Sequence, residues 1–206
     1  MRFAPVALLL LVACSAHRVD LSVQAPATLS SEPPGYEEAV VTRAVDGDTI
    51  EVEVTGRVEG PGAGEATVGE SYVVRMLGID TPESVSPREP VECFGREASA
   101  ATSALLDGKT VRLVKDVEER DGFDRLLRYV YVGAELANAR LVVNGYAHAY
   151  TYPPNVRHAG LLVELQRQAR DGGRGLWSGC PDASATEPGP AASRYLRTNA
   201  SRYSAS

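Results

Sequence analysis

The pattern that most constrains the fold is a series of short segments with strand-like alternation, separated by turn residues. In the clearest one, Ile50, Val52 and Val54 alternate with two glutamates, so one face can be buried while the other is solvated. The Asp46-Gly47 pair just before this segment favours a tight hairpin turn. The segments expected to form strands are 39–45, 49–54, 72–79, 110–114 and 126–132.

Three further segments are expected to be helical. Residues 95–106 are rich in alanine and end near Gly108, and residues 135–144 end at Gly145, which suits a helix C-cap. In residues 157–170 apolar side chains recur at helical spacing along one stripe. This order of elements predicts an α+β fold, a five-stranded OB-type β-barrel with three helices. An α+β sandwich is the alternative.

The amino terminus carries the features of a secretion signal. A positive start is followed by an apolar run, residues 3–12, that is too short to span a bilayer as a mature helix. The run ends in Leu-Val-Ala-Cys, which resembles a bacterial lipobox. Residues 1–13 are therefore predicted to be a lipoprotein signal peptide, and Cys14 the lipidated membrane anchor. Ordinary secretion, with Ala13 as the small residue of the cleavage site, is the alternative.

Composition sets the expected domain boundaries. Residues 14–37 are mostly small and polar and include several prolines, which predicts a flexible tether. Residues 182–206 consist mainly of Ala, Ser, Pro and Gly with scattered Arg and Tyr, which predicts a disordered tail. The folded domain is therefore expected to span residues 38–181.

Two cysteines remain once Cys14 is assigned to the anchor. Cys93 lies just before the first predicted helix, and Cys180 follows the last one. In an oxidising compartment, an even pair of this kind predicts a disulfide. Two unrelated buried thiols are the alternative.

The charge of the chain does not favour a broad nucleic-acid-binding surface. The sequence has 21 Lys and Arg residues against 27 Asp and Glu, a formal net charge of -6. Non-specific nucleic-acid binders usually carry a basic footprint. The only lysines are Lys109 and Lys115, and arginine suits bidentate phosphate contacts rather than a general positive field.

Two charged residues stand in otherwise apolar strand contexts. Asp48 shares the parity of Ile50, so its carboxylate is expected on the buried face, where it needs a cation or hydrogen-bond donors. Arg75 lies inside the apolar segment 72–79, where a guanidinium is costly unless it meets an anion. The alternatives are a simple Asp-Gly turn for the first and a structural ion pair for the second.

Further polar residues lie at the ends of two strands. Asp80, Thr81 and Glu83 surround a proline that rigidifies the turn, and their hard oxygen atoms suit Ca²⁺ or Mg²⁺. Arg125 stands just before the last predicted strand. Taken separately, the acidic group could be a turn or helix-capping cluster, and the arginine a solvated turn residue.

Taken together, the three acidic residues and two arginines match the needs of phosphodiester hydrolysis. That reaction requires neutralisation of the phosphate, an activated water and stabilisation of extra negative charge in the transition state. The histidines add nothing to this set, because His17, His148 and His158 show no metal-ligand spacing.

Five sequence blocks resemble the staphylococcal nuclease family, in order and with similar separations, over about residues 40–180. The blocks are V-D-G-D-T, R-x-x-x-x-D-T-P-E, D-x-x-x-R-x-x-x-Y-V-Y, G-Y-A-H-A-Y-T-Y-P-P-N and G-L-W. The resemblance implies an OB-like barrel with three helices and a single Ca²⁺ between the barrel and the substrate phosphate. By the same resemblance, Asp48 and Asp80 match carboxylate ligands of Ca²⁺, and Thr81 matches a ligand through its backbone carbonyl. Glu83 matches the general base for the attacking water.

The resemblance also implies a substrate pocket. Arg75 and Arg125 match the arginines that bind the phosphate and its transition state, and Tyr150 and Tyr152 match tyrosines that line the nucleotide pocket. Phe123 stands where a pocket tyrosine with a hydroxyl is expected. No catalytic group is lost by this change.

Three other departures from the family pattern bear on substrate affinity. Gly122 stands where a phosphate-contacting lysine is expected. Asp124 replaces a glycine and could either pair with Arg125 or repel the phosphate. The Gly-rich segment 57–69 lengthens the second hairpin.

These observations predict a Ca²⁺-dependent endonuclease that hydrolyses phosphodiester bonds of DNA, RNA or both. It is expected to act as a monomer outside the cell, lipid-anchored to a bacterial membrane (outer membrane or cell surface). A non-catalytic OB-type nucleic-acid-binding module is the main alternative, because OB barrels often bind without chemistry. The presence of all the acidic ligands and both arginines favours catalysis. A structural surface lipoprotein would be supported only by the anchor and tails.

Overall fold

The computed structural model describes residues 19–84 and 91–180. The predicted signal peptide 1–13, the predicted lipidation site Cys14 and the predicted tail 182–206 lie outside the described residues. Within the described ranges, no helix is both long enough and apolar enough to cross a membrane.

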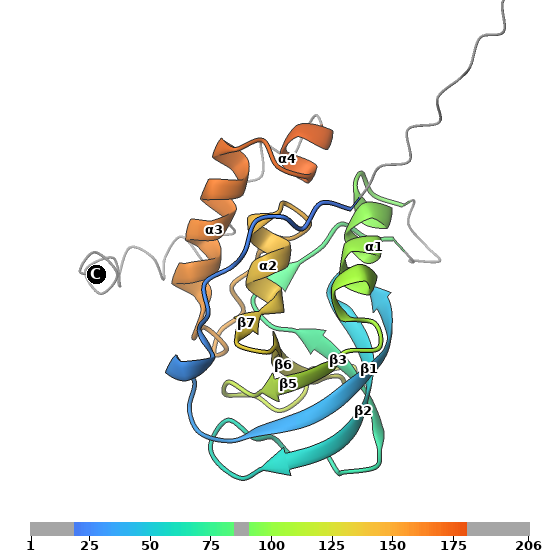
Figure 1. Ribbon diagram of the computed structural model, residues 1–206, viewed down its shortest axis with the longest axis vertical. Coiled ribbons are helices and arrows are strands. Elements are labelled where there is room, and N and C mark those ends of the chain that lie inside the picture. Colours follow the sequence, from blue (N-terminus) through green and yellow to red (C-terminus); the bar gives the residue numbers. More distant parts are fainter. Residues whose placement is uncertain (1–18, 85–90, 181–206) are drawn as a thin grey trace, which may run out of the picture.

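Five strands close into a barrel in the lower half of Figure 1. They are β1 (Tyr36–Asp46), β2 (Thr49–Val58), β3 (Ser71–Met76), β5 (Thr110–Val114) and β6 (Leu126–Val132). Antiparallel pairs give the order β3-β2-β1-β5-β6, and parallel pairing between β3 and β6 joins the two edges. Asp46 pairs with Thr49 across the tight β1–β2 turn, as the Asp-Gly pair predicted. The OB-type barrel is therefore confirmed, and the sandwich alternative is wrong.

Helices gather at one end of this barrel (Figure 1). The three predicted helices are α1 (Gly95–Leu106), α2 (Ala137–Val143) and α3 (Ala159–Asp171), and α4 (Leu176–Gly179) is one further turn. The remaining short elements are the 3-10 helix η1 (Leu29–Ser31) and the strands β4 (Ile79–Asp80), β7 (Glu135–Leu136) and β8 (His148–Ala149).

The barrel core follows the alternation in the sequence. Ile50, Val52 and Val54 of β2 are fully buried, whereas the glutamates between them face outward. Strand β6 is buried along nearly its whole length because it pairs with both β5 and β3. It even buries Arg128, whose Nε lies 3.0 Å from Oε2 of Glu37 in β1, with both side chains inaccessible to solvent.

One strand ends earlier than predicted, and this places a candidate site residue. The segment 72–79 stops at Met76, because Gly78 adopts a φ of +78° and turns the chain. Ile79 and Asp80 then leave the barrel and pair with β8 instead of continuing β3. As a result, Asp80 turns back toward the end of β3.

The amino-terminal segment corrects the expectation of a flexible tether over 14–37. Its described part lies against the domain as far as the start of β1. The backbone of Val23 makes two hydrogen bonds with the side-chain amide of Asn144. The Val23 N–H donates to Oδ1 at 3.0 Å, and Nδ2 donates to the Val23 carbonyl at 2.8 Å. The Ala25 amide donates to a carboxylate oxygen of β7 at 2.7 Å. Composition predicts a linker here because it does not reveal these contacts, whose partner side chains lie more than a hundred residues away in the sequence.

Glu32, at the end of this segment, is buried in the domain. Its side chain is 2 % exposed and lies 2.8 Å from Nη1 of Arg157. It also contacts the ring of His158 and accepts a hydrogen bond from the hydroxyl of Tyr131. Burial alone would raise the pKa of Glu32, but these hydrogen bonds and charges outweigh it and lower the pKa.

Cys93 and Cys180 form a disulfide, as expected. Their sulfur atoms are 2.11 Å apart. Their Cα atoms are 6.0 Å apart, within the usual range for a disulfide. The bond joins Cys93, two residues before α1, to the residue after α4. It therefore ties the middle of the chain to the end of the folded domain.

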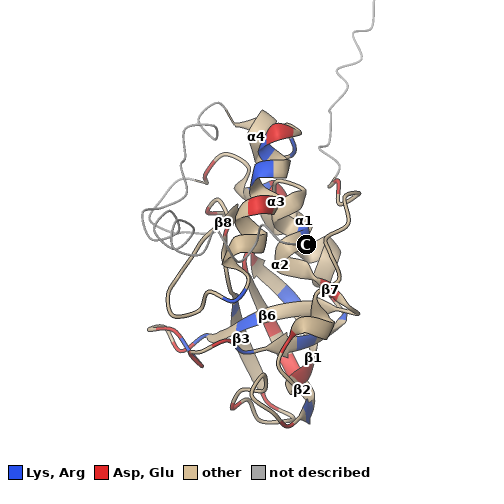
Figure 2. Cartoon of the chain, turned by 90° about the vertical axis from the view of Figure 1, so that its left-hand side faces the viewer, with Lys and Arg blue, Asp and Glu red and all other residues tan. Residues whose placement is uncertain are grey.

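Most of the arginines in the described residues form ion pairs with nearby carboxylates. Figure 2 shows acidic and basic positions interspersed along the chain. The arginines engaged in ion pairs are Arg43, Arg57, Arg75, Arg120, Arg125, Arg128, Arg140, Arg157 and Arg167. Positive charge is therefore supplied by particular arginines rather than by a general basic surface.

Candidate active site

A pocket of about 390 Å³ opens beside the turn that joins β3 to β4. Its lining includes both arginines singled out in the sequence, Arg75 and Arg125. It also includes the three expected aromatic residues, Phe123, Tyr150 and Tyr152. These residues come from the end of β3, the turn before β6 and the segment after β8, so the closed barrel brings distant parts of the chain together.

Arg75 joins this pocket to the acidic residues. Its Nη2 lies 2.9 Å from Oδ1 of Asp80 and 3.1 Å from Oδ2 of Asp48. Its Nη1 donates to the carbonyl oxygens of Met76 and Ile79, at 3.1 and 2.9 Å. The Arg75 side chain is only 18 % exposed. The two carboxylates offset the cost of burying its charge, and the four contacts together fix the plane of the guanidinium.

Asp48 is buried at the start of β2, as its strand parity predicted. Its Oδ2 accepts a hydrogen bond from the Thr81 amide at 3.1 Å, and its Oδ1 accepts one from the Thr49 hydroxyl at 3.0 Å. Thr81 packs so closely on the β1–β2 turn that a Cβ on Gly47 would lie 2.6 Å from Oγ1. Only glycine fits there, so the turn and the β4 segment hold each other in place.

Negative charge is concentrated around Asp80. Burial raises the pKa of its carboxyl, and Arg75 opposes this rise, while the charges of Asp48 and Glu92 add to it. The balance shows that the nearby guanidinium does not fully compensate the cluster. A carboxylate pair in this condition is stabilised by additional positive charge.

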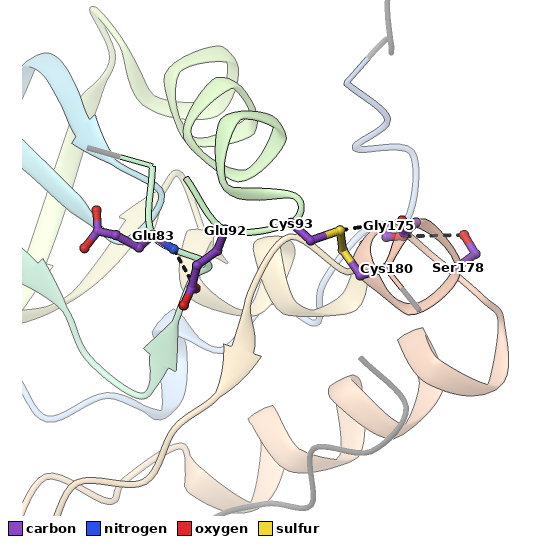
Figure 3. Close-up of a disulfide and its surroundings, with 7 residues drawn as sticks. Glu83, Glu92, Cys93, Gly175, Ser178 and Cys180 are labelled. Atoms are coloured by element: carbon purple, nitrogen blue, oxygen red, sulfur yellow. Dashed lines mark hydrogen bonds between the residues drawn. A yellow bond between two sulfur atoms is a disulfide. The ribbon is translucent and has the colours of Figure 1, made fainter. Parts of the chain in front are cut away.

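Glu83 lies at the edge of the same cluster and is partly buried. Its backbone amide donates to Oε2 of Glu92 at 2.9 Å, and its carbonyl accepts the Glu92 amide at 2.9 Å. The Glu83 carboxylate points away from Glu92 and toward the barrel (Figure 3). Its charge also contributes to a raised pKa at Asp46, which places it within electrostatic reach of the β1–β2 turn.

Arg125 is held by the turn that precedes β6. Asp121 accepts hydrogen bonds from Nε of Arg125 at 2.6 Å and from its amide at 3.0 Å. The guanidinium lies over the ring of Phe123, with its carbon 5.4 Å from the ring centroid. Asp124 was expected either to pair with Arg125 or to repel the phosphate. In the structure it pairs with Arg120 instead, at 3.2 Å.

The aromatic residues of the pocket are unusually accessible. Phe123 is 83 % exposed, and Tyr150 and Tyr152 are 50 % and 55 % exposed. Large apolar rings on the rim of a pocket offer flat faces on which another ring can stack. The pocket therefore combines guanidinium groups with stacking surfaces.

Several residues that shape this site are not indicated by any local sequence pattern. The Asp-Gly pair marks Asp46 only as part of a turn, yet its Oδ1 accepts hydrogen bonds from the Ser84 hydroxyl at 2.6 Å and the Gly47 amide at 2.8 Å. Glu92 and Asp121 are further examples. The acidic character of each was visible, but no local pattern indicated which distant residue it would meet.

Metal binding can be judged from the donor atoms. Among the described residues, no group of three or more His, Cys, Asp or Glu side chains could hold a metal ion. Two carboxylates, those of Asp48 and Asp80, meet at one nitrogen of Arg75. Their carboxylate oxygens are hard donors, which fit a cation such as Ca²⁺ that takes water or a phosphate for its remaining positions.

Comparison with known proteins gives the family. Residues 73–179 match the family model described as "Staphylococcal nuclease homologue". The matched segment runs from within β3 to the end of α4, and so includes the pocket-lining residues named above. The chain belongs to the family of staphylococcal nuclease homologues.

Individual relatives agree with this assignment. Thermonuclease from Staphylococcus hyicus is 37 % identical over 138 residues, covering 67 % of this chain and 74 % of that protein. Thermonuclease from Staphylococcus intermedius is 36 % identical over 152 residues, covering 74 % and 83 %. Endonuclease YncB from Bacillus subtilis (strain 168) is 32 % identical over 138 residues, covering 66 % and 59 %.

Proposed function

We propose that this protein is a Ca²⁺-dependent endonuclease that hydrolyses phosphodiester bonds of DNA, RNA or both. Family membership and the named relatives, two thermonucleases and an endonuclease, support a nuclease. The observation that carries the proposal is the meeting of Asp48 and Asp80 on Arg75, at the wall of a pocket that also contains Arg125.

Asp48, Asp80 and the carbonyl of Thr81 would hold the Ca²⁺. The hard oxygen donors and the approach of two carboxylates to one nitrogen of Arg75 support this choice. When bound, the ion would neutralise phosphate charge and polarise the phosphoryl oxygen. Phosphate binding and proton transfer are assigned to side chains of the protein.

Arg75 and Arg125 are the groups proposed to bind the phosphate. Each guanidinium is already oriented by carboxylates, Arg75 by Asp48 and Asp80 and Arg125 by Asp121. A guanidinium held in this way presents a fixed planar donor group to phosphate oxygens. Such donors gain strength as negative charge accumulates in the transition state, so they accelerate the reaction as well as bind substrate.

Glu83 is the proposed general base. Of Asp48, Asp80 and Glu83, it is the one not assigned to holding the metal, and its carboxylate points toward the barrel (Figure 3). In this role it would accept the proton of the attacking water as the new oxygen–phosphorus bond forms. The phosphodiester bond from phosphorus to one sugar oxygen would break in the same step, and that leaving oxygen would take up a proton from solvent. The preceding Pro82 restricts the backbone at this position.

Phe123, Tyr150 and Tyr152 are proposed to contact the bases. Their exposed rings on the pocket rim suit unstacked bases, as in single-stranded segments. The absence of a lysine at Gly122 and of a hydroxyl at Phe123 leaves stacking and the two arginines as the expected sources of affinity.

The proposed location is outside the cell, on a bacterial membrane through a lipid on Cys14, with the enzyme acting as a monomer. The apolar amino terminus and the Leu-Val-Ala-Cys sequence support this location. Mass spectrometry of the protein isolated from membranes would detect acylation of Cys14. A Cys14→Ala variant should then move to the soluble fraction, and an unchanged distribution would contradict the anchor.

Activity itself can be tested with purified protein, a single-stranded DNA and an RNA of matched sequence, with Ca²⁺ or with excess chelator. The proposal predicts cleavage of at least one substrate in Ca²⁺ and none with chelator. Binding of the oligonucleotide without cleavage under both conditions would instead identify a non-catalytic OB-type binding module. Cleavage that survives chelation would contradict the metal requirement.

A further inference from the structure

Glu83 and Glu92 are joined by two hydrogen bonds, one of them made by the Glu92 side chain. The Glu83 amide donates to Oε2 of Glu92, and the Glu92 amide donates to the Glu83 carbonyl, both at 2.9 Å. The Glu92 carbonyl then accepts the Gly95 amide at 3.1 Å, at the start of α1. The backbone of Glu83 is therefore attached to the segment that enters α1.

Helix α1 also packs directly on Glu83. A Cβ on Gly95 would lie 2.5 Å from the Glu83 carbonyl oxygen, closer than real atoms approach. Pro82 restricts the chain on the other side of Glu83. The orientation of the Glu83 side chain thus depends on where the 92–95 segment lies.

The disulfide is the covalent restraint on that segment. Cys93 immediately follows Glu92, and both residues are exposed. Cys180 belongs to the end of α4, where its amide donates to the Leu176 carbonyl at 3.0 Å. Figure 3 shows Glu83, Glu92 and the disulfide in this order, with the Glu83 carboxylate on the side away from the sulfur atoms.

The α4 end is itself fixed to the domain. The Leu176 amide donates to the Gly145 carbonyl at 2.9 Å, just after α2. Phe94, next to Cys93, stacks on Tyr146 with ring centroids 5.6 Å apart. The disulfide therefore fastens an exposed segment to a rigid support made by α2 and α4.

From these contacts we infer that the Cys93–Cys180 disulfide positions Glu83 for catalysis, with Glu92 as the positioning residue that transmits the restraint. The inference rests on the proposed function, because it concerns the same general base. Neither cysteine lines the pocket, so their effect must pass through the 92–95 segment and the Glu92 side chain that contacts Glu83. Misplacement of a reacting group by about 1 Å can cost roughly 100-fold in rate.

The first experiment compares kcat and KM of the full chain with those of a Cys93→Ser/Cys180→Ser variant and a Glu92→Ala variant. Both changes should lower kcat by roughly 10- to 100-fold and leave KM within about twofold, because they disturb the base and not the phosphate contacts. The Glu92→Ala protein keeps the disulfide, so it provides the test even if the serine variant folds poorly.

Two further variants separate positioning from other effects. Glu92→Gln keeps a side-chain oxygen that can accept the Glu83 amide but loses the charge, so it should retain most of the activity. Leu113→Ala removes a buried side chain of β5 and serves as a control for lost stability, with kcat expected to stay near the wild-type value. Glu92→Gln falling as far as Glu92→Ala would show that the charge matters instead, and would overturn the inference.

The link between disulfide and Glu92 can be tested by combining the changes. If both act through the same contact, the triple variant should be no slower than the slower of its parents. Multiplied losses would contradict this. A readout independent of activity is the exchange rate of the Glu83 amide proton, followed by NMR, which should rise at least about tenfold in the serine variant.

The outcomes distinguish this inference from the proposed function. An unchanged Glu83 exchange rate in the folded serine variant overturns the positioning role, whatever the enzyme does. Loss of kcat in Glu83→Gln together with full activity in the cysteine and Glu92→Ala variants would leave the general base intact and refute the positioning role alone.

Discussion

The Nη2 nitrogen of Arg75 lies 2.9 Å from Oδ1 of Asp80, although Asp80 belongs to a separate short strand. This contact exists because Gly78 turns the chain back at the end of β3. It connects a residue proposed to bind phosphate with a residue proposed to bind metal. The two functions are therefore coupled through one side chain.

Arg75→Lys should reduce kcat/KM by roughly 10²–10³-fold, because an ammonium cannot make the paired hydrogen bonds of a guanidinium fork. It would also lose the simultaneous contacts with Asp48, Asp80 and two carbonyl oxygens. Steady-state kinetics on a single-stranded oligonucleotide measures the effect. Arg43→Lys, in an exposed ion pair of the β1–β2 hairpin, is the matched control and should stay near wild type.

Ca²⁺ should support faster turnover than Mg²⁺. Two carboxylates and a backbone carbonyl leave a small, open oxygen site, and Ca²⁺ tolerates irregular geometry and higher coordination numbers. Mg²⁺ demands a near-ideal octahedron. Metal-stripped protein assayed with each ion over the same concentration range tests this. Equal maximal rates with the two ions would argue against the proposed ligand set.

Glu32 should make the stability of the domain pH-dependent. Its pKa is lower in the folded protein than its ordinary value of 4.5, because hydrogen bonds from His158 and Tyr131 outweigh the effect of burial. The stabilisation is therefore fully present above about pH 5 and is lost as the pH falls through the lowered pKa.

Urea unfolding of wild type and Glu32→Gln at several pH values measures this contribution. Loss of the buried ion pair should cost roughly 1–3 kcal/mol near neutral pH, and the difference should shrink under acidic conditions. Glu70→Gln, at an exposed position, is the control. A difference that grows as the pH falls would refute the sign of the shift.

The sequence predicted the barrel and the burial of Asp48 because both follow from local alternation. Ile50, Val52 and Val54 define a buried face, and Asp48 shares their parity. Resemblance to a family, rather than physics alone, indicated that Arg125 would reach the same pocket. The closing pair β3–β6 that brings it there joins segments about fifty residues apart.

Other features depended on partners that no local pattern reveals. The composition of the amino-terminal segment predicts a linker. Its backbone is nevertheless hydrogen-bonded to Arg140 of the distant α2 and to Asn144 just after that helix. No local pattern distinguishes Glu92 in the sequence, and only the fold brings its carboxylate to the Glu83 amide. The acidic residues and arginines of the site can be selected from the sequence by their type and position. The residues that orient them, such as Glu92 and Asp121, are revealed only by the fold.

Glu83→Gln tests the central claim most directly. The amide keeps the size and polarity of the side chain but cannot accept a proton from water. Single-turnover cleavage of a single-stranded oligonucleotide in saturating Ca²⁺ should slow by about 10²–10⁴-fold, with oligonucleotide binding unchanged. A Glu83→Gln protein that cleaves at nearly the wild-type rate would contradict the account and show that another group activates the water.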